Sequence, residues 1–423
     1  MRFRPWGAGL ALAGVLTASL AQVPAGNPLD LLPATPTPTP RQEAPPRVDA
    51  SVPQGATAVG LERRITPIRF DISGVKVLPF AEVAQPFAAL VGQPTTVAQL
   101  VAAAGAATAR YRDAHYPLSF VFVPEQDFAG GAVRVVAVEG HVDAIRIEGD
   151  AGSAEPTLRA ISAALLEEKP LTQATFERVT QLYARVPGVT VSASASLPQD
   201  MDGHTTLVLK AKHQPYNVTL GADLRQPVPR AVLSGIWNDP LAAGGQVNAS
   251  TLLGDPAKER LWTLGYNQLI GADGLRLKAN YSDYRGYPDE SLGKGDVLER
   301  LNTNHRLDLS ADYPLLLTAQ RSVTVSGGFY AVDNAARYSV PAAGQWLAQE
   351  TQVRAAFVQL NLAETQASSS RGASLMLAQG FDGLGARDEF TSNVPGLAGA
   401  GSTQLSFTRV AADYTQRNRF ANQ

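Results

Sequence analysis

The sequence predicts an antiparallel transmembrane β-barrel that follows a signal peptide, a proline-rich linker and two small β-α-α-β-β domains. Three observations support this fold class: a basic and apolar N-terminus, an element order that occurs twice within residues 61–213, and alternation of apolar and polar residues along one strand after another in the C-terminal half. A period of two over segments of about ten residues is typical of outer-membrane barrels, because one face of each strand meets lipid and the other meets a wet lumen.

The N-terminus has the features of a secretory signal peptide. Arg2 and Arg4 precede an apolar stretch that is too short to span a bilayer as a helix. The small residues Ser19 and Ala21 favour cleavage after Ala21. We therefore expect residues 1–21 to be removed on export from the cytoplasm, the alternative being a short N-terminal anchor.

Residues 22–60 are expected to form an extended periplasmic linker. They are rich in proline, threonine, alanine and glutamine, and Pro and Thr alternate up to Pro40. A segment of this composition cannot bury a core and tends towards polyproline II. The linker is therefore expected to separate the signal peptide from the first folded domain.

Two successive segments, 61–141 and 142–213, share the element order β-α-α-β-β. Each opens with a strand that ends in a glycine, at Gly74 and at Gly149. Each continues with two stretches of helical spacing and then with two strands that a turn separates. A repeat of this length indicates two tandem domains of the same fold.

Residues 214–423 are expected to form the barrel, with about ten strands. Each candidate strand is long enough to cross the hydrocarbon when tilted, since about 9–11 residues suffice. The expected strands are 216–225, 230–237, 245–253, 260–268, 275–284, 304–313, 322–331, 351–362, 371–380 and 402–415.

The links between these strands are of two kinds. Some are short, as at Gly271–Gly274, whereas 286–302, 333–349 and 381–401 are long and polar. Outer-membrane barrels keep short turns in the periplasm and long loops outside, so the long links are expected on the outer side. The apolar register slips at residues 357–358, which suggests a β-bulge there.

Short motifs in both domains and in the barrel carry a family resemblance. They are residues 111–117, 123–126, 130–135, 138–142, 183–189 and 312–314. On these motifs residues 60–423 resemble the two-partner secretion transporters, which are the haemolysin and filamentous-haemagglutinin secretion/activation proteins. That family belongs to the outer-membrane superfamily in which POTRA domains precede a β-barrel.

The sequence departs from the pattern of that family in several places. His115 stands where the family usually has glycine, which suggests a less tight turn. The family barrel has sixteen strands, of which about ten fit here, so we expect a chain truncated at its C-terminus. A motif similar to the tip of the family's lumenal loop surrounds Arg285, but it follows only the fifth strand, so a turn is the favoured interpretation.

The resemblance implies an outer-membrane transporter of a Gram-negative cell, with no enzymatic activity and no cofactor. Its periplasmic POTRA domains would recognise a cognate secreted exoprotein as an unfolded chain, and the protein would export or activate this partner. Outer-membrane lipid and the barrel-assembly machinery are further implied partners, whereas the net charge of -2 gives no field that attracts nucleic acid.

Two alternatives remain open at this point. The first is an assembly factor that inserts other outer-membrane proteins, although such factors usually carry three to five POTRA domains and two are expected here. The second is a non-functional fragment, because an unclosed barrel leaves strand edges unpaired in lipid.

Partner recognition by this kind of domain would use the main chain of an exposed sheet edge, to which an extended polypeptide adds as a further strand. The candidate edges are the strands at 118–123 and 189–197, and the alternative role for each side chain there is core packing. The candidate partner-binding residues are Tyr111, Leu118, Ser119, Phe120, Val121, Phe176, Val189 and Val191. The candidate lumen-lining residues are Arg225, Arg276, Lys278, Arg306, Asp308 and Asp312.

No motif of reaction chemistry occurs in the sequence. A Gly-x-Ser-x-Gly elbow, a His-Glu-x-x-His pair and a Walker loop are all missing. The five histidines lack the spacing of metal ligands, and without cysteine neither disulfides nor thiolate metal sites can form. We therefore predict no catalytic, cofactor-binding or metal site.

Overall fold

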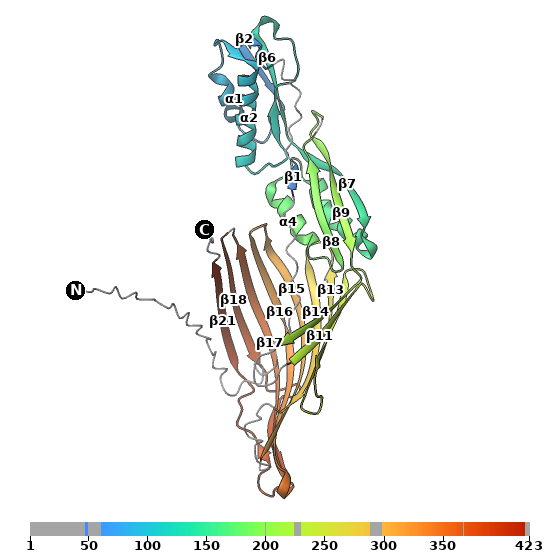
Figure 1. Ribbon diagram of the computed structural model, residues 1–423. Coiled ribbons are helices and arrows are strands. Elements are labelled where there is room, and N and C mark those ends of the chain that lie inside the picture. Colours follow the sequence, from blue (N-terminus) through green and yellow to red (C-terminus); the bar gives the residue numbers. More distant parts are fainter. Residues whose placement is uncertain are drawn as a thin grey trace, which may run out of the picture.

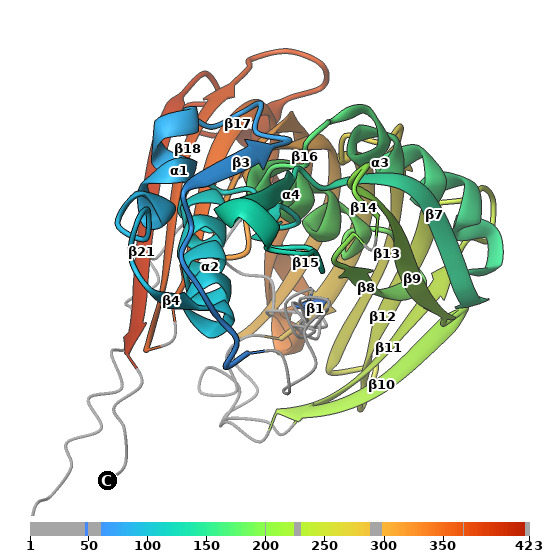
Figure 2. The ribbon, with the colours of Figure 1, turned by 90° about the horizontal axis from the view of Figure 1, so that it is seen from above.

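The protein consists of two small α/β domains that stand above a large curved sheet (Figure 1, Figure 2). The predicted signal peptide, and all of the predicted linker except residues 47–49, lie outside the described residues. None of the described helices is long and apolar enough to cross a bilayer. The computed structural model describes residues 47–49, 61–198, 200–223, 230–287, 298–366 and 368–418.

The first domain packs two helices on one face of a small sheet. Its elements are β2 (Arg64–Ile65), β3 (Arg69–Ser73), α1 (Phe80–Ala88), β4 (Thr95–Thr96), α2 (Val97–Asp113), β5 (Phe120–Phe122) and β6 (Ala132–Val138). The sheet order is β3-β6-β5, which makes β5 an edge strand. Thr96 and Gln99 form a capping box that begins α2, and the helices bury Phe87, Leu100 and Tyr111 against the sheet.

The second domain repeats this arrangement. Its elements are β7 (His141–Asp150), α3 (Glu155–Glu167), α4 (Gln173–Tyr183), β8 (Val189–Ser196) and β9 (His204–His213). A short strand from the linker segment, β1 (Arg47–Asp49), extends the sheet, whose order is β1-β8-β9-β7. The predicted repetition of β-α-α-β-β is therefore present, with one added strand that the sequence did not indicate.

The two repeats share a glycine that their backbone geometry requires. Gly74 follows β3 with φ +85°, and Gly149 lies near the end of β7 with φ +87°. A Cβ at Gly74 would stand 2.0 Å from the carbonyl oxygen of Ala137, and one at Gly149 would stand 2.4 Å from that of Ala211. Both glycines thus allow the first strand of a domain to approach its last strand closely.

The large sheet is antiparallel, and within the residues that the structure describes no pairing joins its first strand to its last. Its strands are β10 (Tyr216–Asp223), β11 (Arg230–Asn238), β12 (Gly245–Leu253), β13 (Glu259–Ile270), β14 (Leu275–Gly286), β15 (Glu299–Leu317), β16 (Arg321–Val340), β17 (Gln345–Thr365), β18 (Ser369–Gly380), β19 (Arg387–Ser392), β20 (Gly399–Ala400) and β21 (Thr408–Asn418). Ten strands follow one another in the order β10 to β18 and then β21, while β19 and β20 branch from β17. Each of the ten expected strands coincides with one strand on this path.

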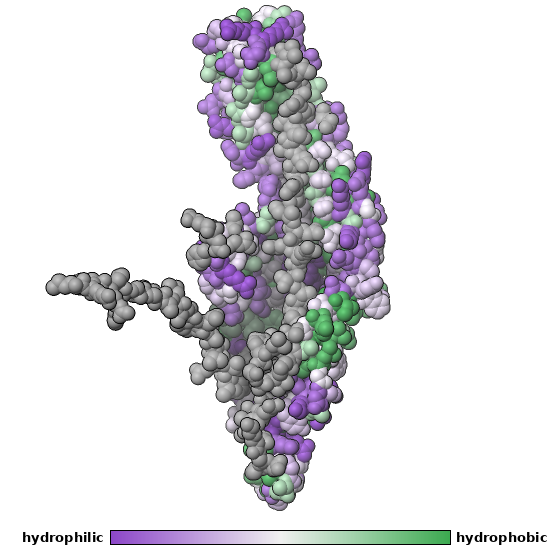
Figure 3. Space-filling model, viewed as in Figure 1, coloured by the Kyte–Doolittle hydropathy of each residue, from purple (hydrophilic) through white to green (hydrophobic). Residues whose placement is uncertain are grey.

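The two faces of the sheet differ in the way the alternation predicts. Val218 and Leu220 of β10 are 68% and 67% exposed, and Leu264, Leu309 and Leu375 on later strands are also exposed. Figure 3 shows an apolar patch over β10 and β11 in this view. Exposed aliphatic side chains at every second position form the face that a barrel turns towards lipid.

The longest strands extend well past the expected limits. β16 and β17 have 20 and 21 residues, and residues 333–340 pair with 345–352, where the sequence predicted a loop over 333–349. At about 3.3 Å per residue such a strand spans about 66 Å, roughly twice the hydrocarbon thickness of about 30 Å. The hairpin therefore projects beyond the rest of the sheet, on the side away from the two domains (Figure 1).

The bulge predicted at residues 357–358 is wrong. β17 pairs with β16 in unbroken register through this region, and a register shift lies instead between Pro314 and Leu316 of β15, where proline has no N–H to donate. Phe357 interrupts the alternation because its side chain packs against a buried apolar cluster that includes Tyr330. This cluster lies on the face of the sheet that is otherwise polar. The apolar pattern changes face here without a change in pairing.

Replacing Gly74 by alanine is expected to destabilise the first domain by about 2–4 kcal/mol, because a side chain there combines a left-handed backbone with a clash against a carbonyl oxygen. Gly105, which is exposed within α2 and has open space around it, is the matched control. Gly105→Ala should stabilise the domain by about 1 kcal/mol. Urea titration of the full chain with pulse proteolysis measures both, and equal effects would contradict the assignment.

Candidate polypeptide-binding site

The side chains predicted to bind a partner are almost all part of the protein core. Seven of the eight are at most 8% exposed, and Val191 packs partly buried against the core of the second domain. A buried side chain cannot touch a polypeptide outside the domain, so any contact at these segments would use the main chain of a strand edge. The seven buried residues are Tyr111, Leu118, Ser119, Phe120, Val121, Phe176 and Val189.

Tyr111 and Glu139 belong to the motifs that carried the resemblance, and they form one hydrogen-bonded group. The Tyr111 hydroxyl donates to Glu139 Oε1 over 3.1 Å, and the same oxygen accepts the backbone N–H groups of Lys76 and Val77 over 2.7 and 2.9 Å. Burial and then the Glu139 carboxylate raise the pKa of Tyr111, and burial raises the pKa of Tyr183 in the second domain to about 12. The Tyr111 hydroxyl thus joins α2 to the end of β6, whereas the Tyr183 hydroxyl joins α4 to Ser162 of α3.

In the first domain, a side chain of the domain itself occupies main-chain groups at the β5 edge of the sheet. Antiparallel pairing with β6 turns the N–H and C=O of Val121 in β5 outwards. The Thr108 hydroxyl on α2 accepts the Val121 N–H over 2.9 Å and lies 3.2 Å from its carbonyl oxygen. A polypeptide could pair with Val121 only after displacing this side chain.

The edge of the second domain is open over most of its length. Strand β8 reads Val-Thr-Val-Ser-Ala-Ser-Ala-Ser and has no charge, proline or bulge, which are the devices that natural proteins use to protect an edge. On its outer side β1 pairs in parallel with Ser194–Ser196. Within the part of the chain that the structure describes, no strand pairs with the outer side of Val189–Ala193.

The second domain is fixed to the sheet through α4. Leu182 lies in one apolar cluster with Leu269 and Leu317, which flank the turns that face the domain. The Arg276 guanidinium donates to the backbone oxygen of Arg185 over 3.1 Å. Burial and then the charge of Arg276 lower the pKa of Arg185. This junction places β8 at the end of the sheet where the short turns lie.

The predicted lumen-lining residues that the structure describes share one face of the sheet, the inner face, opposite the exposed aliphatic residues. Arg276 and Asp312 are cross-strand partners on β14 and β15. Lys278 forms an ion pair with Asp312. The Arg306 guanidinium donates two hydrogen bonds, of 2.6 and 2.7 Å, to the Asp308 carboxylate. Charges of both signs thus lie on this face, with ion pairs between Lys278 and Asp312 and between Arg306 and Asp308. Arg225 lies outside the described residues.

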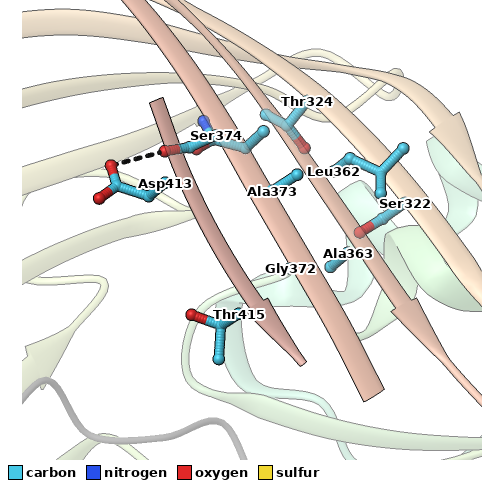
Figure 4. Close-up of a pocket in the computed structure, with 10 residues that line it drawn as sticks. Ser322, Thr324, Leu362, Ala363, Gly372, Ala373, Ser374, Asp413 and Thr415 are labelled. Carbon is cyan, nitrogen blue, oxygen red and sulfur yellow. Dashed lines mark hydrogen bonds between the residues drawn. The ribbon is translucent and has the colours of Figure 1, made fainter. Parts of the chain in front are cut away.

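A shallow hollow of about 280 Å³ marks the inner face near the end where the two domains stand (Figure 4). Thr324, Asn361, Ser374 and Asp413 are successive cross-strand partners on β16, β17, β18 and β21. The Ser374 hydroxyl donates to Asp413 over 3.1 Å. Small polar side chains in register leave space here, whereas larger ones would fill it.

Two local expectations need correction. Arg285 lies in β14, paired with Thr303 of β15, and so belongs to a strand and not to a turn or a loop tip. His115 has φ +66°, the left-handed conformation that glycine adopts readily, so the turn keeps its tight geometry with histidine in it. The His115 carbonyl accepts the N–H of Gln173 at the start of α4, and this bond joins the two domains.

Comparison with known proteins agrees with this architecture. Residues 65–140 match the family described as POTRA domain, ShlB-type. The fold of the chain is similar to that of CdiB from Escherichia coli, with a TM-score of 0.53 and 18% identity over 88% of this chain and 72% of that one. The chain has a POTRA domain and the fold of a POTRA-plus-barrel protein. The resemblance inferred from the motifs is thereby confirmed for the domain and for the fold.

Other solved structures resemble this POTRA-plus-barrel protein more weakly. CdiB from Acinetobacter baumannii gives a TM-score of 0.45 at 15% identity, over 83% of this chain and 68% of that one. BamA from Haemophilus ducreyi lacking POTRA domains 1–3 gives 0.39 at 13% identity, over 75% and 70%. No curated protein sequence matches the chain.

Two features of the candidate site were not foreseen from the sequence. Thr108 lies among apolar residues of α2, and a polar residue on the buried face of a helix is the signal that could have pointed to a backbone contact. The pairing of β1 carries no local signal, because the linker composition favours an extended chain whether or not a strand lies beside it.

Replacing Thr108 by valine in this POTRA domain should free the outward main-chain groups of Val121 in β5. The change leaves the Val121 N–H and C=O without the hydroxyl, at about 1–3 kcal/mol for each buried group left unpaired. Amide exchange at Val121 should accelerate strongly, whereas Thr108→Ser retains the hydroxyl and should exchange like the unaltered protein. Identical amide exchange rates at Val121 in the valine and serine variants would show that the Thr108 hydroxyl does not protect this edge.

Replacing Leu182 by alanine should loosen the junction between the second domain and the sheet. Loss of a buried leucine costs about 2–5 kcal/mol, so proteolysis at the Gln214–Pro215 connector should become faster. Leu241, 77% exposed in the neighbouring turn between β11 and β12, provides the control, and its alanine variant should lie within about 0.5 kcal/mol of the unaltered chain. Cleavage that does not distinguish the two variants would show that α4 is not held at the sheet.

Proposed function

We propose that this protein is an outer-membrane transporter that recognises a partner exoprotein with its periplasmic domains and exports it through its barrel. In this proposal residues 61–141 and 142–213 are the periplasmic domains and 214–423 form the barrel. The observation that carries the proposal is the open edge of β8. An edge strand binds an extended chain through main-chain hydrogen bonds, which suit an unfolded substrate of many sequences.

The side chains of β8 support this role. Val189, Ala193 and Ala195 point into the core, whereas Ser192 and Ser196 are exposed, and β8 itself carries no charged side chain. The strand therefore places no charge of its own opposite an added strand. Hydroxyl groups opposite an added strand also form favourable cross-strand pairs.

The inner face of the sheet supports the second step, passage across the membrane. Charges of both signs line it, which suits the passage of an unfolded chain that carries both basic and acidic segments. The hollow near Ser374 and Asp413 lies on the side of the domains, where an exported chain leaving β8 would enter. Folding of the exported chain outside the cell is the proposed driving force, because the periplasm supplies no nucleotide.

The exposed apolar face fits outer-membrane lipid as the surrounding medium, and insertion by the barrel-assembly machinery is part of the proposal. In the proposed orientation the short turns and both domains face the periplasm. The β16–β17 hairpin then projects outside the cell.

A photo-crosslinking amino acid at Ser192 tests the proposal. During secretion it should capture a protein that also appears in the culture medium and that disappears from the medium when residues 61–213 are deleted. The control position is Arg146, which is exposed on β7 at the opposite edge of the same sheet. Capture at Ser192 should exceed capture at Arg146 by about ten-fold, as expected for binding at one specific edge.

Two outcomes would refute the proposal. Equal capture at the two edges would show that β8 has no special affinity for the exported chain. Secretion that continues without residues 61–213 would show that the domains are not needed for recognition. A defect in many unrelated outer-membrane proteins on the same deletion would instead favour an assembly factor.

A further inference from the structure

Two arginines stand opposite each other on the large sheet, at the end of β13 and β14 that lies away from the second domain. Arg260 of β13 and Arg285 of β14 are register partners. They lie on the face that carries the exposed aliphatic side chains, because Leu264 and Tyr281 of that face are register partners four residues further along the same strands. Like charges directly opposite each other destabilise a sheet. Packing alone therefore does not account for this pair.

One of the two arginines has an acidic partner, and the other has none within the described residues. Arg260 forms an ion pair of 3.1 Å with Asp283, which is largely buried and also lies 3.1 Å from Nδ1 of His305. Arg285 is exposed, and no described residue forms an ion pair or a hydrogen bond with its side chain. The carboxylate of Asp283 is already engaged, so the charge of Arg285 remains available to an anion.

The position of the pair along the strands corresponds to the rim of the apolar band. On β14 the residues of this face are Leu275, Leu277, Ala279 and Tyr281 before the charged end is reached. Arg285 lies ten residues beyond Leu275, which is about 33 Å along the strand. Strands of outer-membrane barrels are tilted by about 40°, so this length rises by about 25 Å, the height of the apolar band of such barrels.

An aromatic pair lies between the aliphatic residues and the arginines. Trp262 follows Arg260 by two residues and precedes Leu264 by two, and its ring centroid is 5.2 Å from that of Tyr281. Tryptophan and tyrosine concentrate where hydrocarbon gives way to headgroups. Leucine, aromatic ring and arginine thus follow one another towards the outer end, as acyl chain, ester region and phosphate do in a lipid.

We propose that Arg260 and Arg285 bind the phosphate group of a lipid in the outer leaflet, whose acyl chains lie along Trp262 and Leu264. Guanidinium groups offer paired N–H donors that match phosphate oxygens, and two of them can share one phosphate. The negative charge between them would remove the repulsion of the empty pair. The inference rests on the membrane orientation of the proposed function and is independent of the exported partner.

Lipid retention by the full chain in micelles of an uncharged detergent tests the site. Phosphatidic acid, whose headgroup is a phosphate monoester, is titrated in, and bound lipid is measured by native mass spectrometry. Arg285→Gln should weaken retention about ten-fold, because charge-assisted hydrogen bonds to the phosphate are lost. Arg371→Gln is the matched control and should bind as the unaltered chain does, because Arg371 is exposed on the same face but has Glu364 as its register partner.

Thermal unfolding separates a binding role from a structural one. Without lipid, Arg285→Gln should unfold at a temperature no lower than that of the unaltered chain, because the like charge opposite Arg260 is gone. Phosphatidic acid should raise the unfolding temperature of the unaltered chain more than that of the variant, since a ligand stabilises the state that binds it. Earlier unfolding of the variant without lipid would assign Arg285 to the stability of the sheet and overturn the proposal.

A large excess of inorganic phosphate distinguishes a lipid from a free anion. Retention of phosphatidic acid in this excess supports the lipid, whereas its displacement would show a site for free phosphate and overturn the lipid assignment. Equal retention by Arg285→Gln and Arg371→Gln would overturn the site itself. None of these measurements involves an exported chain, so failure of the lipid site leaves the proposed export function standing.

Discussion

Backbone hydrogen bonding at strand edges is the constraint on which the structure depends. Each edge strand presents N–H and C=O groups that need partners, and the two POTRA-type domains meet this need differently. In the first domain Thr108 occupies the outward groups of Val121. In the second, a borrowed strand covers three residues of β8 and leaves five without a neighbouring strand among the described residues. Two copies of one fold therefore differ in their capacity to bind a polypeptide.

The position of the second domain determines which of the two sheet edges lies near the large sheet. Leu182 and Arg185 join α4 to the turns of the large sheet, and the bond from Gln173 to His115 joins α4 to the first domain. The same helix thus positions both neighbours. The open edge of β8 thus belongs to the domain that lies against the large sheet, whereas β5 belongs to the first domain, which stands further from that sheet (Figure 1).

Alternation of apolar and polar residues was enough to predict the ten principal strands, because lipid on one face forces a period of two. The same signal fails at the ends of β16 and β17 that lie away from the two domains (Figure 1). Residues such as Asn334 and Ala335 pair in the ladder without an apolar face, so the segment resembled a loop. At Phe357 the pattern misled in the opposite direction, because an apolar cluster on the inner face was taken for a bulge.

The candidate site could be predicted only in part. Helical and strand spacing indicated which strands stand beside which helices; β5 is the outer strand of its sheet, and β8 is flanked on its outer side only by the three residues of β1. Spacing could not show that the side chains there face the core, that Thr108 closes one edge, or that Arg47–Asp49 reaches the other. These contacts join residues from 13 to almost 150 positions apart, and no local pattern encodes them.

The side chains of β8 are uniformly small, and this affects how firmly the register of a neighbouring strand is fixed. Strands whose side chains differ in size resist slippage, because a shift by two residues replaces one set of neighbours by another. Along Thr190, Ser192, Ser194 and Ser196 each such shift finds another small hydroxyl, so successive registers have nearly equal energy. If β8 binds the exported chain as proposed, that chain could shift in two-residue steps and exchange one set of main-chain partners for an equivalent set.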